Sequence, residues 1–275
     1  MAQRNRPPRR RERPSQPQAA TQAGPRKPGG LDQLEGRNPV LECLSRKRRR
    51  MHKLLIDERA RAHPKLDRLL QSAAAQGVGL LRVPREELDA ISLTGVHNGV
   101  IAWVDPLTAP SLTELLDGLD AQGIEPFLIL VDEPQYEHNL GAILRSALGA
   151  GVHAVVVPRV RGKEVNAVVQ RVAMGAAEVV PVIREGLSSC LAMLERRAVR
   201  IIGAEHGGQP HWQVNMTGAV AIVLGGEDKG LTAPLLKRCH AIATIPTSGD
   251  LQSLNLSVTA GVLMYERVRQ QTVSR

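Results

Sequence analysis

The sequence contains few aromatic residues, few cysteines and no long apolar run. Aromatic residues make up only 2% of its 275 residues, so its cores must be aliphatic and stacking of nucleic-acid bases on aromatic side chains is not expected. No stretch of 18 or more apolar residues occurs, which argues against a transmembrane helix. The three cysteines, Cys43, Cys190 and Cys239, are far apart and form no CxxC pattern. We therefore expect neither a metal site nor a disulfide framework.

Basic residues are distributed unevenly along the chain. The net charge is +9, and residues 1–30 carry eight basic side chains against one acidic one, Glu12. This stretch is rich in Pro, Gln and Arg, has almost nothing to bury and lacks the apolar segment of a secretory signal. We expect residues 1–31 to be a disordered basic tail and the protein to be cytoplasmic. The tail is either an arm that seeks phosphates or a solubilising extension.

A second basic cluster, Arg46-Lys47-Arg48-Arg49-Arg50, lies inside sequence that predicts folded structure. Five adjacent cations repel one another unless an anion compensates them. The cluster therefore favours binding of nucleic acid over a merely solvated face.

The residues that follow the tail predict a small α/β domain at 32–104. Asn38-Pro39 is typical of a helix start, helical periodicity continues at 65–76 and 85–91, and apolar runs at 53–57, 80–83 and 99–104 predict strands. Residues 105–123 contain Pro106 and Pro110 and then a polar helix. This composition is typical of a linker between domains.

From residue 124 to 275 short aliphatic runs alternate with helical segments. Strands are predicted at 127–131, 154–157, 179–183, 199–203, 219–224 and 241–245, with helices at 139–148, 165–176, 188–198 and 232–238. Such alternation indicates a parallel sheet covered on both faces. Ligands bind such sheets at the carboxyl ends of the strands, so polar, glycine-bearing loops after strands are candidate sites.

Three of these loops are candidates. The first runs from Glu137 to Arg145 and contains Asn139, a helix-capping residue type; the second is Leu224-Gly225-Gly226-Glu227-Asp228-Lys229-Gly230-Leu231; the third runs from Ile245 to Ser257. In the third, Ser253 is expected to cap a helix that extends to about residue 270. The second loop is not a phosphate-binding P-loop, because Leu231 stands where that motif requires lysine. No GxGxxG follows the first strand of this region, so a dinucleotide site is only weakly indicated.

Together the three loops resemble the motifs of the SpoU/TrmH family of RNA 2′-O-ribose methyltransferases, within the knotted SPOUT class. Residues 139–145, 224–231 and 245–258 look like its first, second and third motifs, in the right order. Residues 35–40 and 97–102 are similar to the ribosomal-protein-L30-like RNA-binding domain of the rRNA-modifying subgroup. The family usually has Asp-Pro shortly before the asparagine, where this chain has Tyr136-Glu137.

The resemblance implies a trefoil-knotted α/β fold, a homodimer with RNA as its partner, and S-adenosylmethionine as cofactor. Carried over onto this chain, the cofactor contacts fall on Gly225, Ile245 and Leu254. The implied catalytic residues are Asn139, Arg145, Glu227, Ser253 and Asn255. No metal is needed, because the transferred methyl group is already activated on a sulfonium.

The implied reaction is methylation of a ribose 2′-hydroxyl in RNA, with a guanosine of large-subunit rRNA as the expected target. A tRNA target is one alternative, and a non-catalytic RNA-binding or ribosome-assembly protein of the same fold is another. Arg145 is either a phosphate clamp or, in family proposals, a general base; since arginine stays protonated, the clamp fits its charge better. His138 is a weaker candidate for the base.

Overall fold

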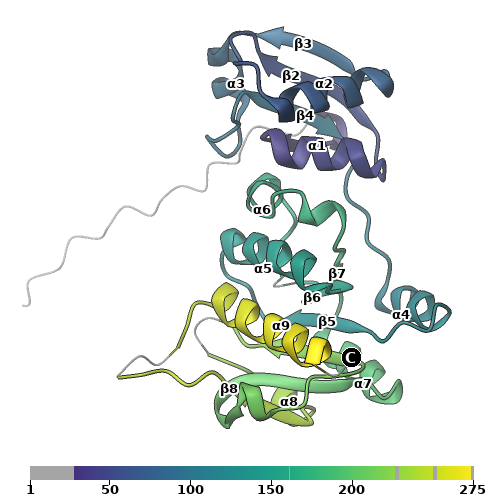
Figure 1. Ribbon diagram of the computed structural model, residues 1–275, viewed down its shortest axis with the longest axis vertical. Coiled ribbons are helices and arrows are strands. Elements are labelled where there is room, and N and C mark those ends of the chain that lie inside the picture. Colours follow the sequence, from purple (N-terminus) through teal and green to yellow (C-terminus); the bar gives the residue numbers. More distant parts are fainter. Residues whose placement is uncertain (1–27, 161, 227–228, 250–252, 274–275) are drawn as a thin grey trace, which may run out of the picture.

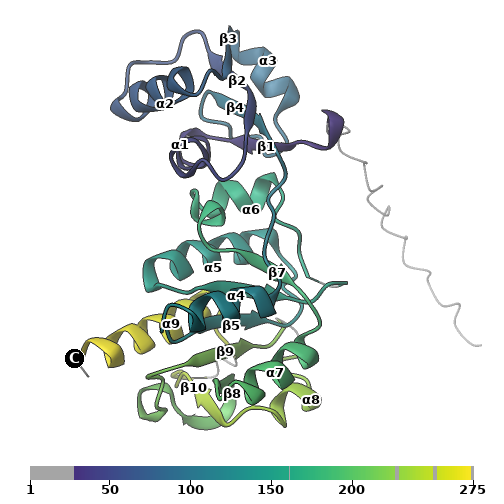
Figure 2. The same cartoon turned by 90° about the vertical axis from the view of Figure 1, so that its right-hand side faces the viewer.

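The computed structural model describes residues 28–160, 162–226, 229–249 and 253–273, and the expected basic tail lies almost entirely outside this range. The described residues form two units, stacked along the long axis of the molecule (Figures 1 and 2). We call residues 28–104 the N-terminal unit and residues 112–273 the C-terminal unit. Each has its own sheet.

The N-terminal unit is a four-stranded sheet in the order β1-β4-β2-β3. Its strands are β1 (Asp32–Glu35), β2 (Met51–Asp57), β3 (Gly79–Val83) and β4 (Val100–Val104), and its helices are α1 (Arg37–Arg46), α2 (Pro64–Ala75) and α3 (Arg85–Ile91). Aliphatic side chains form the core, among them Leu34, Val40, Leu54 and Leu69. The strand β1 was not predicted. Three of its four residues are polar although all four are buried, so the sequence shows neither an apolar run nor an alternation of apolar and polar side chains.

The C-terminal unit is built on a six-stranded sheet in the order β10-β8-β9-β5-β6-β7. The strands are β5 (Phe127–Val131), β6 (Ala154–Val157), β7 (Val182–Arg184), β8 (Arg200–Pro210), β9 (Val220–Leu224) and β10 (Ala241–Thr244). Every neighbouring pair is parallel, which confirms the predicted sheet. The strand β8 runs well past the predicted 199–203, because it pairs with β10 on both sides of a bulge.

Helices cover both faces of this sheet. The helices α5 (Glu137–Ala150), α6 (Ala167–Val172) and α9 (Leu256–Val273) lie on one face, and α4 (Leu112–Asp120), α7 (Leu187–Arg196) and α8 (Ala233–Leu236) on the other. Successive side chains of a strand point to opposite faces, so Ile129 packs with the first set and Leu130 with the second. The stretch expected to be a linker thus contains α4, which packs on the C-terminal sheet, and only residues 105–111 connect the units in extended form.

A buried ionic cluster at Arg49 joins the two units. The Arg49 side chain is only 3% exposed and pairs with Asp32 at 3.1 Å and with Glu178, which lies in the 3-10 helix Ala176–Glu178. It also donates to Oε1 of Gln170 at 2.6 Å and to the backbone oxygen of Asp105 at 3.0 Å. Burial raises the pKa of Glu178, and the charge and hydrogen bonds of Arg49 act in the opposite direction.

The structure removes Arg49 from the basic cluster that was expected to favour nucleic acid, whereas Arg46, Lys47, Arg48 and Arg50 are exposed. The anions that compensate it belong to the protein: Arg46 pairs with Glu42 at 2.7 Å, and Arg49 pairs with Asp32 and Glu178. Arg48 donates to the backbone oxygen of Glu178 at 3.1 Å. Two of the five cations thus contact the C-terminal unit.

We predict that Arg49→Met weakens the attachment of the two units to each other. Removing one partner of a buried ion pair leaves an uncompensated charge and typically costs about 3–5 kcal/mol. Protease cleavage within 105–111 and a larger radius of gyration in small-angle X-ray scattering would report the loss. The matched control is Arg46→Met, since the exposed Arg46–Glu42 pair is worth at most about 1 kcal/mol. Equal protease resistance of both variants would contradict the prediction.

Candidate active site

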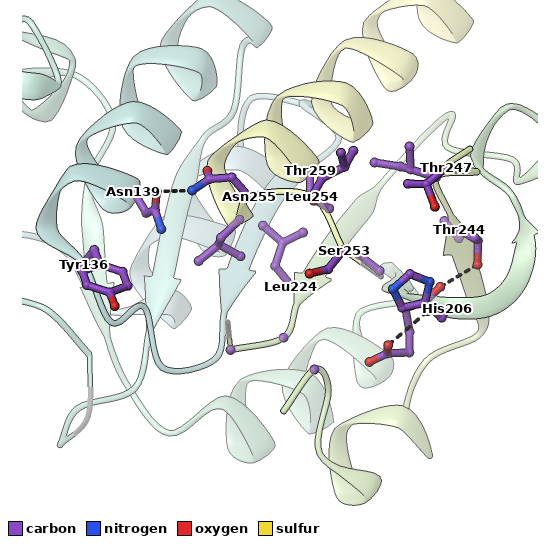
Figure 3. Close-up of a pocket in the computed structure, with 18 residues that line it drawn as sticks. Tyr136, Asn139, His206, Leu224, Thr244, Thr247, Ser253, Leu254, Asn255 and Thr259 are labelled. Atoms are coloured by element: carbon purple, nitrogen blue, oxygen red, sulfur yellow. Dashed lines mark hydrogen bonds between the residues drawn. The ribbon is translucent and has the colours of Figure 1, made fainter. Parts of the chain in front are cut away.

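A cavity of about 520 Å³ lies at the carboxyl ends of strands of the C-terminal sheet. Its walls come from residues at or after the ends of β5, β9 and β10, from Ala204–His206 in the middle of β8, and from the start of α9 (Figure 3). This is the edge at which a parallel sheet of this class binds ligands. All three loops singled out in the sequence contribute to it.

The loop after β9 forms one wall mostly from backbone. Gly225 and Gly226 both line the cavity, and Gly226 is bridged to Gly230, whose N–H donates to the Gly226 oxygen at 3.1 Å. A Cβ at position 225 would overlap the backbone of Gly230 and Leu231. The tight return of this loop therefore requires glycine at 225.

Glu205, on β8, stabilises the same loop through hydrogen bonds. One of its carboxylate oxygens accepts the N–H of Leu231 at 2.8 Å, and its backbone oxygen accepts the hydroxyl of Thr244 at 2.6 Å. Thr244 in turn accepts the N–H of Gly208 at 2.8 Å. These bonds join the loop after β9 to the paired ends of β8 and β10.

The segment before α9 brings two predicted residues together. The Asn255 side chain donates to Oδ1 of Asn139 at 3.1 Å, which ties the start of α9 to the first turn of α5 (Figure 3). Oδ1 of Asn255 also accepts the N–H of Ser257 at 2.9 Å. Asn255 is therefore the cap of α9, which begins at Leu256. The prediction that Ser253 caps this helix is wrong, because Ser253 lies in the extended approach to it.

The predicted site residues fall into two groups. Six line the cavity: Asn139, Ser253, Asn255, Gly225, Ile245 and Leu254. Arg145 does not line it and is exposed on α5, where it makes no hydrogen bond or ion pair with the described part of the chain. Glu227 lies outside the described residues, and His138 is exposed and does not line the cavity.

Ala204, Glu205 and His206 were missed, although they line the cavity. Their signal was present, since a polar pair and two glycines follow the aliphatic run of β8. The predicted strand ended at 203, so the stretch after it had the same character as the other three loops. It differs from the first and third of them in that no helix start follows it.

Metal and thiol chemistry find little support within the described ranges. No group of three or more His, Cys, Asp or Glu side chains there could hold a metal ion. Burial raises the pKa of Cys43 to about 11 and that of Cys190 to about 12, which keeps both thiols protonated near neutral pH. No described helix is both long enough and apolar enough to span a membrane.

Two family models match the chain, one to each unit. Residues 126–265 match the SpoU rRNA Methylase family. This chain belongs to that family. Residues 33–110 match the family described as RNA 2'-O ribose methyltransferase substrate binding. The resemblance seen in the motifs is thereby confirmed, and so is the α/β fold it implied.

Curated relatives of this SpoU family member match almost their whole length. The chain is 37% identical to the 23S rRNA (guanosine-2'-O-)-methyltransferase RlmB of Escherichia coli (strain K12), over 88% of this chain and 99% of the relative. It is 34% identical to the protein of the same name from Pseudomonas putida, over 89% of this chain and 99% of the relative.

Solved structures of the family share the fold across both units. The crystal structure of an RNA 2'-O ribose methyltransferase aligns with a TM-score of 0.72 and 25% identity, over 88% of this chain and 90% of that one. The SpoU methyltransferase AviRb from Streptomyces viridochromogenes, in complex with AdoMet, aligns with a TM-score of 0.74 and 23% identity, over 90% and 92%.

We predict that Asn255→Ala destabilises the C-terminal unit by about 1–2 kcal/mol, the sum of a lost helix cap and a lost hydrogen bond. Urea unfolding followed by circular dichroism measures this. The control is Ser257→Ala, which removes a hydroxyl bonded to the same Asn255 oxygen and leaves the cap in place. The prediction fails if the two variants unfold at the same urea concentration.

Proposed function

We propose that this protein transfers a methyl group from S-adenosylmethionine to the ribose 2′-hydroxyl of a guanosine in large-subunit rRNA. The observation that carries the proposal is the match to RlmB over 99% of that protein's length, through both family models. A non-catalytic protein would have no need for the glycine loop and the hydrogen-bonded pair Asn139–Asn255 around a cavity. A tRNA target has no comparable support among the relatives, whose names specify 23S rRNA.

The cavity suits the cofactor in size and in chemistry. Its 520 Å³ lie within the range of small-molecule sites, about 300–1,000 Å³. Apolar side chains such as Leu224, Leu254 and Leu256 alternate on its walls with backbone groups and hydroxyls, which fits an adenosine. When bound, S-adenosylmethionine supplies a methyl group that is already activated. We assign its contacts to Gly225, Ile245 and Leu254.

The two asparagines would position the substrate ribose. Asn139 is buried and lies at the opposite end of the cavity from Thr247 and His206 (Figure 3). Its bond to Asn255 fixes the orientation of both amides, so a hydroxyl entering at this end meets preorganised partners. Ser253 is exposed on the approach to α9 and would contact the ribose or the loop around it.

Arg145 and Glu227 would contribute to the site through their own charges. Arg145, exposed on α5, has no acidic neighbour among the described residues, so its guanidinium is available to clamp the phosphate next to the target ribose and to stabilise charge on the 2′-oxygen. Glu227, which belongs to the loop after β9, would orient Arg145 or Asn139 by a charge-assisted hydrogen bond.

The knot, the dimer and the location also belong to this proposal. The strand β10 is at the edge of the sheet beside β8, whereas α9 packs on α5. The chain must therefore pass from one to the other across the ends of β8 and β9, and we propose that it does so as a trefoil knot.

A face formed by α5 and α9 would be covered by a second copy in a homodimer. Its exposed apolar and aromatic side chains are Tyr136, Leu148, Val258 and Tyr265. An rRNA substrate places the protein in the cytoplasm. We propose an RNA-binding domain at 32–104 and a methyltransferase domain that begins with α4 instead of at residue 124, joined by residues 105–111.

The direct test is to incubate the protein with S-adenosylmethionine and an unmodified 23S rRNA transcript and to map 2′-O-methylation. We expect one guanosine to be modified. Methylation of tRNA but not of the transcript would redirect the proposal, and binding of the transcript without methylation would refute the enzymatic function.

Arg145→Ala is expected to lower turnover about 10²–10³-fold, the usual effect of removing one group that stabilises transition-state charge. Calorimetry should show unchanged binding of S-adenosylmethionine, because Arg145 does not line the cavity. Arg145→Lys should recover part of the rate if the residue is a clamp, and should shift the pH–rate profile if it is a base. Arg196→Ala, exposed on α7, is the control. Full activity of Arg145→Ala would exclude both roles.

Gly225→Ala is expected to abolish binding of S-adenosylmethionine, because the new methyl group would displace Gly230 and Leu231. Gly261→Ala is the matched control: a Cβ at this α9 position meets nothing within 4 Å, and alanine is favoured over glycine in helices by about 0.5–1 kcal/mol. Equilibrium dialysis with labelled cofactor gives the readout. Equal cofactor affinity in the two variants would remove the loop after β9 from the proposed site.

A further inference from the structure

A second cavity, of about 480 Å³, lies where the N-terminal unit meets α6. We call it the junction groove. Four basic side chains line it: Arg37 and Lys65 at the starts of α1 and α2, Arg85 on α3, and Arg171 on α6. The two units therefore form opposite walls, and α6 lies between α1 and α5 in both views (Figures 1 and 2).

The positive charge of the junction groove is largely uncompensated. Neither Arg37 nor Arg171 has an ion pair with a described residue, and the Nε of each is buried without a hydrogen-bond partner there. Lys65 bonds only to the neutral side chain of Asn38, at 3.0 Å. Arg85 is more than half exposed and stays 3.7–3.8 Å from its acidic neighbours.

The acidic residue on the wall, Glu35, is already fully engaged. Its oxygens accept hydrogen bonds from Ser92, Thr94 and the backbone N–H of Leu93. Burial alone would raise the pKa of Glu35, but these bonds together hold it below its ordinary value. Its oxygens are thus engaged by the loop 92–94, and the four cations that line the groove outnumber this one carboxylate.

Arg49 shows what a structurally satisfied arginine looks like at the same junction. It is paired with two carboxylates and bonded to a carbonyl and an amide oxygen. A buried N–H without an acceptor is costly, so Arg37 and Arg171 are less well satisfied than Arg49. An anion in the groove would give these two cations the counter-charge that no described residue supplies by an ion pair.

The helices that begin at the groove and at the active-site cavity, α1 and α9, start on the same side of the molecule in Figure 1. The end of α1 lies at the linker, since Arg49 bonds to Asp105, and the linker descends on the right of Figure 1. The start of α1 therefore lies on the left. The helix α9 also starts on the left, because the C-terminus is marked at its right end, and Asn255 joins that start to α5.

We infer that the junction groove binds backbone phosphates of the substrate RNA, held between Arg37 and Lys65 on one wall and Arg171 on the other. This inference rests on the proposed function and adds to it a contact made by both units at once. Arginine suits phosphate because its planar guanidinium can donate two parallel hydrogen bonds. RNA bound at the active site would thereby also be held at the junction groove, which lies on the other side of α5 and α6.

The test compares the double variant Arg37→Gln/Arg171→Gln with the control Arg68→Gln, whose side chain is exposed on α2 away from the groove. Binding to a 23S rRNA transcript is measured at several KCl concentrations from about 0.05 to 0.3 M, a range over which the release of counterions changes the affinity strongly. The slope of log affinity against log salt should fall by about 0.7–0.9 for each phosphate contact removed. Arg171→Lys should keep the wild-type slope, since lysine retains the charge.

The outcomes separate the groove from the proposed function. Unchanged S-adenosylmethionine binding and thermal unfolding, with a reduced salt slope, supports the groove. If the double variant does not fold, Lys65→Gln with Arg171→Gln takes its place, because Lys65 is exposed. A slope equal to that of the control, while the wild type still methylates the transcript, overturns the groove and leaves the function standing. Binding of inorganic phosphate to the wild type is measured as well. If phosphate binds as tightly as the transcript, the groove is a site for a free anion only, and the inference is overturned.

Discussion

The active site depends on one constraint of the parallel sheet: all of its strands end at the same edge. The chain leaves that edge at β10 beside β8, yet its last helix packs on α5, on the other side of β9. It must therefore return across the strand ends. This return brings the amide nitrogen of Asn255 within 3.1 Å of the amide oxygen of Asn139, 116 residues earlier in the chain. It also lets residues at 245–247 and 253–256 line the cavity.

Much of the C-terminal unit could be predicted from the sequence, because its strands are buried on both faces. The predicted bounds of β5 and β6 agree with the structure residue for residue, since an aliphatic run that ends in polar residues leaves little choice. The prediction failed where pairing and not composition sets the limits. The strand β8 continues through a polar, glycine-containing stretch because β10 pairs with it there, and no local pattern shows that.

The basic residues show the same limit for function. Arg46–Arg50 was a conspicuous cluster, but the fold supplies Arg49 with Glu178 from 129 positions away, and this pairing cannot be read from neighbouring residues. Arg37 and Arg171 were inconspicuous, each standing alone in its segment. Only the folded chain shows that they face one groove without acidic partners. Clustering in sequence was thus a poor guide to which cations remain available for a ligand.

The position of the Arg49 cluster also determines how the two units can move. It sits where the linker begins, at Asp105, so the covalent connection and the strongest non-covalent one share one side of the junction. On the groove side the direct bond from Asn38 to the C-terminal unit is a weak one, to the sulfur of Met174 at 3.3 Å. Any rotation between the units must therefore pivot about the Arg49 side and widen the other. The groove side is therefore the side of the junction that such a rotation would open, while the contacts of Arg49 would be kept.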